Sequence, residues 1–182
     1  MRKQLTSEMM QTLIGSFLMG AISTIGDLLW ELFIPQHQTH WGILHGILLC
    51  FLMGAILGRM SGSWKTAKTF GLWEIGVGAV SAGLFYALWP LMGWSAMFVA
   101  WMVLWLMTAW IMDRALRSGE AFKWMALRGV LAAVLSGAVF YLISGIWTDP
   151  PPDGPNYPLN FAFWTLAFIP GFAALVLRRC KD

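Results

Sequence analysis

Six long apolar stretches fill most of this 182-residue sequence, and short polar breaks separate them. The stretches lie at 12–34, 41–60, 70–89, 95–112, 127–147 and 159–177. Each contains about 20 residues, the length that a helix needs to cross the hydrocarbon core of a bilayer. Polar and apolar residues do not alternate along them, which argues against barrel strands. The sequence therefore predicts an all-α integral membrane protein with six transmembrane helices, in a single transmembrane domain covering 1–182.

The composition agrees with this class. Hydrophobic residues make up 58% of the chain and charged residues 12%, whereas a soluble domain has roughly 25% charged residues. The formal net charge of +3 is explained by membrane orientation and by attraction to anionic lipid head groups. Because no basic patch stands on a foldable soluble module, we expect membrane lipids as partners and no nucleic acid.

The basic residues predict an orientation. All twelve fall at the two ends of the chain, or within or directly beside the breaks after the second and fourth stretches. They are Arg2, Lys3, Arg59, Lys65, Lys68, Arg114, Arg117, Lys123, Arg128, Arg178, Arg179 and Lys181. The positive-inside rule then places both termini in the cytoplasm. We expect a bacterial inner (cytoplasmic) membrane as the location.

A sequence pattern that recurs three times predicts an internal repeat. A Gly-Ala pair begins at Gly20, Gly78 and Gly137, and a Trp follows each pair ten or eleven residues later. This spacing favours three helical hairpins of the same orientation, at about 12–60, 70–114 and 127–179. The alternative is that small residues and interfacial Trp recur in any protein with six spans.

Small residues also predict where helices approach one another. Pairs of glycines leave shallow helix faces that allow close backbone packing in membranes. The pairs are Gly15 with Gly20, Gly54 with Gly58, and Gly76 with Gly83.

Two features near the predicted cytoplasmic face have simple interpretations. Glu74 opens the third stretch, where it could reach water or pair with Lys68. Lys123, Trp124 and Arg128 lie around the start of the fifth stretch, a mixture that suits a short helix lying in the membrane interface.

The densest polar cluster lies at the outer end of the first predicted hairpin. It consists of Asp27, Glu31, His37, His40 and His45. Asp27 and Glu31 are four residues apart, so both carboxylates leave one face of a helix. We expect Asp27 to face the interior, within reach of His45, because a lipid-exposed acid is costly.

This cluster allows three interpretations. Asp27, Glu31 and His45 could form a ligand-binding or proton site. All five residues are candidate ligands for Zn²⁺ or another divalent ion. Asp27 and His45 could instead form only a structural hydrogen bond between two helices.

The sequence contains no nucleophile elbow, Walker loop, paired-cysteine motif or zinc-protease signature. It identifies no catalytic residue and no cofactor, which favours a function other than catalysis. We expect a small inner-membrane protein that binds a lipid-like or small polar ligand in an outward-opening intramembrane cavity. It would act as a transport component or as a subunit of a larger membrane complex, with other membrane subunits or a second copy as partners. The alternatives are a membrane-embedded enzyme or metal-binding protein that uses Asp27, Glu31 and His45, and a purely structural subunit.

Overall fold

The computed structural model of this chain describes residues 2–33, 38–116, 122–148 and 156–176. These ranges form six α-helices that are long and apolar enough to cross a membrane. The helices are α1 (Arg2–Phe33), α2 (Thr39–Ser61), α3 (Trp64–Met92), α4 (Ser95–Leu116), α5 (Phe122–Thr148) and α6 (Tyr157–Val176). The prediction of an all-α protein with six membrane-spanning helices is confirmed at this level.

Three helices begin at least five residues earlier than the apolar stretches indicate. α1 begins at Arg2, α3 at Trp64 and α5 at Phe122, instead of at 12, 70 and 127. Hydropathy detects only the part of a helix that lies in hydrocarbon, and polar or basic residues can extend the same helix beyond it. Lys123 and Arg128 therefore belong to the first two turns of α5, and the expected separate interfacial helix is wrong.

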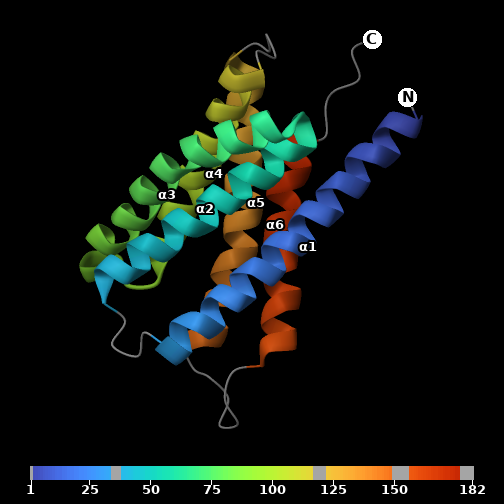
Figure 1. The fold of residues 1–182 in the computed structure, drawn as a ribbon. Coiled ribbons are helices and arrows are strands. Elements are labelled where there is room, and N and C mark those ends of the chain that lie inside the picture. Colours follow the sequence, from blue (N-terminus) through green and yellow to red (C-terminus); the bar gives the residue numbers. More distant parts are fainter. Residues whose placement is uncertain (1, 34–37, 117–121, 149–155, 177–182) are drawn as a thin grey trace.

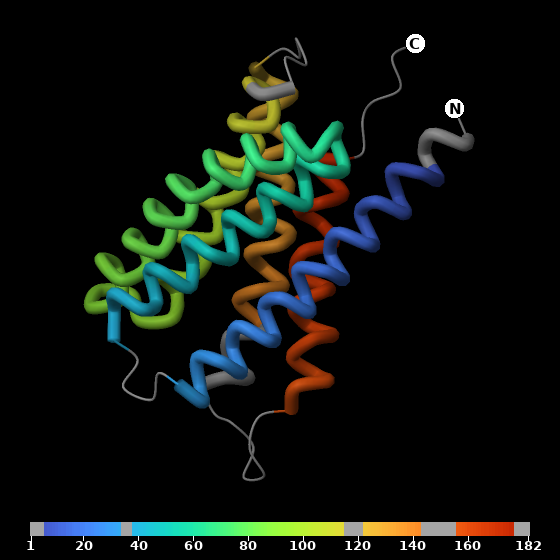
Figure 2. The backbone as a smooth tube through the Cα atoms, in the orientation of Figure 1, coloured from blue at the N-terminus to red at the C-terminus, as the bar shows by residue number. Residues whose placement is uncertain are grey.

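Most helices pack against a neighbour in the chain, but α1 packs against α6. α1 runs diagonally across α6, and α2 lies along α3 (Figure 1). α4 packs on α5, and α5 packs on α6 (Figure 2). The consecutive helices α1 and α2 share few contacts. The predicted hairpin 12–60 is thus not a closely packed pair, and the threefold repeat stays a prediction.

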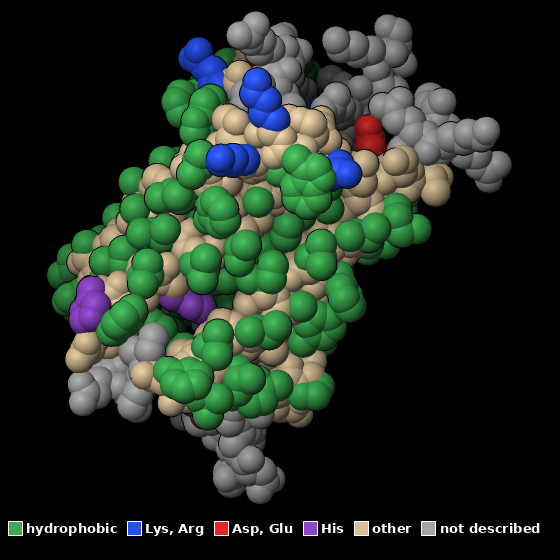
Figure 3. Space-filling view, viewed as in Figure 1, with side chains coloured by type: hydrophobic (Ala, Val, Ile, Leu, Met, Phe, Trp, Pro, Cys, Tyr) green, Lys and Arg blue, Asp and Glu red, His purple; other side chains and the backbone are tan. Residues whose placement is uncertain are grey.

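Charged and apolar side chains occupy different parts of the surface. Hydrophobic side chains cover most of the face in Figure 3, while the Lys and Arg side chains gather at one end. Many large apolar side chains are exposed, including Leu142 at 77% and Leu48 at 55%. Such a surface is suited to contact with lipid tails. We call the end that carries Arg59, Lys65 and Lys123 the basic end.

Aromatic rings accompany the cations at the basic end. Three cation–π pairs have distances of 5.3 to 5.7 Å between the cationic group and the ring centroid. They are Arg59 with Trp64, Arg114 with Trp110, and Lys123 with Trp124. Rings and cations together are typical of the membrane–water interface. The cytoplasmic location of this end remains the prediction of the positive-inside rule.

Small residues let α2 and α3 approach closely. They recur every fourth position along one face of α2, at Gly42, Gly46, Cys50, Gly54 and Gly58. A Cβ atom added at any of these four glycines would lie within 3.0 Å of an atom of α3. We call these five residues the small-residue stripe. Its spacing is the pattern that supports close helix contacts in membranes.

The three predicted glycine pairs have different outcomes. Gly54 and Gly58 face α3, and a Cβ at Gly15 or Gly20 would overlap Phe172 or Thr165 of α6. These two pairs are therefore confirmed as points of close approach. The third pair is wrong, because a Cβ at Gly76 or Gly83 would meet only open space.

Aromatic side chains fill the core where α4, α5 and α6 meet. The Trp101 and Phe140 rings stack, with centroids 4.2 Å apart and an interplanar angle of 13°. Trp164 of α6 lies beside both, at 6.0 Å from Trp101 and 4.8 Å from Phe140. These contacts hold Trp164 in place next to α1.

Candidate functional site

Polar side chains meet between α1 and α6, at the end opposite the basic end. Asp27 Oδ2 accepts hydrogen bonds from Asn160 Nδ2 at 3.1 Å and from Trp164 Nε1 at 2.6 Å. One turn further along α1, Glu31 Oε2 accepts a hydrogen bond of 2.6 Å from Tyr157 Oη. We call these five residues the polar seam. It ties together two helices that are far apart in the sequence.

Helix periodicity explains how the polar seam forms. Asp27 and Glu31 are four residues apart on α1, and the three α6 residues are three and four apart. Such spacings place side chains on one face of a helix. Because α1 crosses α6 closely (Figure 1), the two polar faces meet.

The polar seam contains hydrogen-bond acceptors that remain unfilled. Both donors to Asp27 reach Oδ2, and Oδ1 receives no hydrogen bond from the described residues. Asn160 is only 1% exposed, and its Oδ1 atom has no partner in the described part of the chain. A buried acceptor without a partner costs about 1–3 kcal/mol. The arrangement therefore suits a group that donates hydrogen bonds.

His45 lies beside α1 but does not belong to the polar seam. Its imidazole lies against Gly26 and forms an edge-on contact with Trp30, with ring centroids 5.8 Å apart. The predicted hydrogen bond between Asp27 and His45 is not among those of the described residues. Instead, α6 occupies the side of α1 that carries Asp27. Successive residues on a helix point about 100° apart, so Gly26 and Asp27 face different neighbours.

The other histidines do not join the polar seam. His40 is exposed near the start of α2, with its ring centroid 5.3 Å from that of Trp41. His37 lies outside the described residues. Among the described residues, no group of three or more His, Cys, Asp or Glu side chains is arranged to hold a metal ion.

Glu74 lies outside the polar seam, and its surroundings differ from those predicted from the sequence. It is 0% exposed, and Thr108 Oγ1 of α4 donates a hydrogen bond of 3.1 Å to its Oε2 atom. The expectation that it reaches water or pairs with Lys68 is wrong. α3 begins at Trp64, which puts Glu74 roughly 15 Å further along the helix than its first residue.

Two sequence signals could have indicated these positions. Glu74 shares a helix face with Gly71 and Gly78, and such a face packs against a neighbouring helix. Asn160 is a polar residue inside an apolar stretch, four residues before Trp164. Polar residues in membrane spans usually face the bundle interior.

Comparison with known protein families, with curated proteins and with solved structures finds no match to this chain.

Proposed function

We propose that this chain is a small polytopic membrane protein that binds a lipid-like or small polar ligand at the polar seam. It would serve as a transport component or as a subunit of a larger membrane complex. The observation that supports this proposal most directly is the pair of unfilled acceptors, Asp27 Oδ1 and Asn160 Oδ1. A polar residue inside a membrane span is a functional candidate by default, because lipid does not tolerate it without a partner.

The chemistry of the polar seam indicates the kind of head group that it would bind. Asp27 and Glu31 are carboxylates, and Asn160 offers a carbonyl oxygen, so the ligand must donate hydrogen bonds. A primary ammonium or a hydroxyl group meets this requirement, and an ammonium also matches the negative charge. The surrounding α1 and α6 surfaces are apolar, which fits a ligand that carries a hydrocarbon part. In the predicted orientation, the polar seam lies near the outer side of a bacterial inner membrane.

The test compares bound molecules in matched variants. Wild-type protein is extracted in mild detergent, and its bound species are measured by native mass spectrometry with added phosphatidylethanolamine or phosphatidylcholine. We expect the primary ammonium lipid to be retained preferentially. Asp27→Asn keeps the side-chain size and removes the charge, and should reduce this retention about tenfold. Asp113→Asn removes a carboxylate at the basic end and should leave retention unchanged.

A second measurement separates binding from a purely structural role. The hydrogen bonds from Asn160 and Trp164 to Asp27 could serve only to hold α1 on α6. In that case Asp27→Asn would lower the melting temperature in detergent while the bound species stayed the same as in wild type. That outcome would replace the ligand-binding proposal with the structural one.

A further inference from the structure

A groove runs along the surface between α5 and α6. Its volume is about 340 Å³, near the lower end of the range for ligand pockets. The residues that line it are Arg128, Leu131, Leu135, Pro170, Ala173 and Ala174. It is separate from the polar seam, since Arg128 lies in the first turns of α5, at the basic end.

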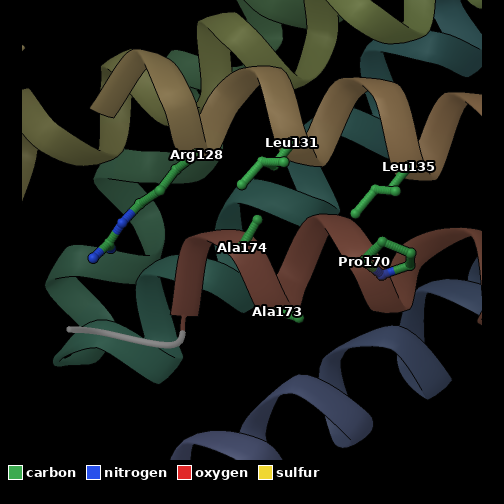
Figure 4. A pocket seen from close by; sticks show the side chains of 6 residues that line it. All are labelled: Arg128, Leu131, Leu135, Pro170, Ala173 and Ala174. Carbon is green, nitrogen blue, oxygen red and sulfur yellow. The ribbon is translucent and has the colours of Figure 1, made fainter. Parts of the chain in front are cut away.

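The lining is apolar along its length and cationic at one end. Figure 4 shows Leu131 and Leu135 of α5 facing Ala174 and Pro170 of α6. In the same view, Arg128 lies at the end of the groove nearest the end of α6. Leu131 and Leu135 are 45% and 51% exposed, so this wall faces the surroundings of the bundle. The small Ala173 and Ala174 side chains leave the space that a larger residue would fill.

The charge of the groove selects one kind of lipid. A guanidinium binds phosphate through charge-assisted hydrogen bonds, which are stronger than neutral ones. Arg128 also belongs to the basic end, where the other cations add to the attraction for anionic head groups. The rest of the groove is apolar and suits a hydrocarbon chain. A chain bound there would leave no buried polar group without a hydrogen-bond partner.

We propose that this groove binds one anionic phospholipid, with its phosphate at the Arg128 guanidinium and an acyl chain along Leu131, Leu135 and Ala174. This site lies at the opposite end of the molecule from the polar seam and does not depend on the function proposed there.

Native mass spectrometry of the full chain tests the proposal, with phosphatidylglycerol and phosphatidylcholine added in separate titrations. We expect one phosphatidylglycerol molecule to bind more tightly than phosphatidylcholine. Arg128→Gln should weaken that binding about fivefold. Lys123→Gln removes an equal charge at the same end but outside the groove, so it should weaken the binding less than Arg128→Gln does.

A steric variant tests the apolar part of the site without changing the charge. Ala173→Phe should fill the groove and weaken phosphatidylglycerol binding, while Leu142→Phe, outside the groove, should not. Equal binding of the two lipids would overturn the proposal. Equal losses of phosphatidylglycerol affinity in Arg128→Gln and Lys123→Gln would also overturn it, because they would show only a general attraction to the basic end. Unchanged binding in Ala173→Phe would also contradict it.

Discussion

Asp27 and Glu74 are both acids inside membrane-spanning helices, and their surroundings differ. Asp27 is partly buried and receives two side-chain donors from α6. Glu74 is fully buried and receives one donor, Thr108, while its Oε1 atom has no partner among the described residues. Among the described residues, the Thr108 hydroxyl is therefore the side-chain donor to the Glu74 carboxyl, and we expect its removal to destabilise the protein.

Thr108→Val tests the contact between α4 and Glu74. Valine matches the shape of threonine but cannot donate, so the carboxyl loses its interhelical hydrogen bond. Interhelical hydrogen bonds in membranes contribute about 0.6 kcal/mol on average and up to about 1.7 kcal/mol. We expect a loss of about 1 kcal/mol in the free energy of unfolding, measured by denaturation in mixed micelles.

Thr69→Val provides the matched control for Thr108→Val. Thr69 is exposed, and its hydroxyl donates to the backbone carbonyl of Lys65 within the same helix. This substitution should change the free energy of unfolding by less than about 0.5 kcal/mol. If the two variants lose the same free energy of unfolding, the buried hydrogen bond from Thr108 to Glu74 stabilises the protein no more than an exposed one does.

The contact between α2 and α3 depends on the small size of the residues along the small-residue stripe. Gly54 lies against the Glu74 side chain and the Phe70 carbonyl, so this stripe also encloses the buried acid. Close backbone approach replaces the hydrophobic driving force that lipid does not provide between helices. Any added atom at this surface must push α3 away.

Gly54→Ala and Gly76→Ala compare the same change on two faces of the bundle. A methyl group at Gly54 would overlap Glu74, whereas a methyl group at Gly76 would meet open space. We expect Gly54→Ala to cost about 1–3 kcal/mol. Gly76→Ala should be neutral or slightly stabilising, because alanine favours the helix more than glycine does. Thermal unfolding in detergent measures both, and a similar effect at the two positions would contradict this packing.

The basic end and the polar seam lie at opposite ends of the protein, and this separation predicts its orientation in the membrane. Lys65 lies at the basic end, and Gln38 precedes α2 at the other end. A cysteine introduced at Gln38 should react with a membrane-impermeant thiol reagent in intact cells, and one at Lys65 should be protected. A Cys180→Ser background removes the native thiol near the end of the chain. Labelling at Lys65 and protection at Gln38 would reverse the predicted orientation.

The spans were predictable from sequence, and the helix partners were not. An apolar stretch of about 20 residues crosses a bilayer as a helix, because a helix satisfies its own backbone hydrogen bonds. Hydropathy does not determine which helices pack together, because an apolar helix face can contact lipid tails as favourably as it contacts another helix. Asp27 and Glu31 could be predicted as site candidates because exposing a carboxylate to lipid is costly. Their partners Asn160 and Tyr157 required knowledge of the α1–α6 contact, which depends on the shapes of all six helices.

The pairing of α1 with α6 has a consequence for how the protein is made. Asp27 is separated from Asn160 and Trp164 by 133 and 137 residues, and α6 is the last of the six helices to leave the ribosome. At a synthesis rate of about 5–20 residues per second, α1 waits on the order of ten seconds before its donors exist. During translation the Asp27 carboxyl must therefore be sheltered by water, by lipid head groups or by the insertion machinery. Nascent chains stopped before α6 should expose this acid and become early substrates for membrane quality control.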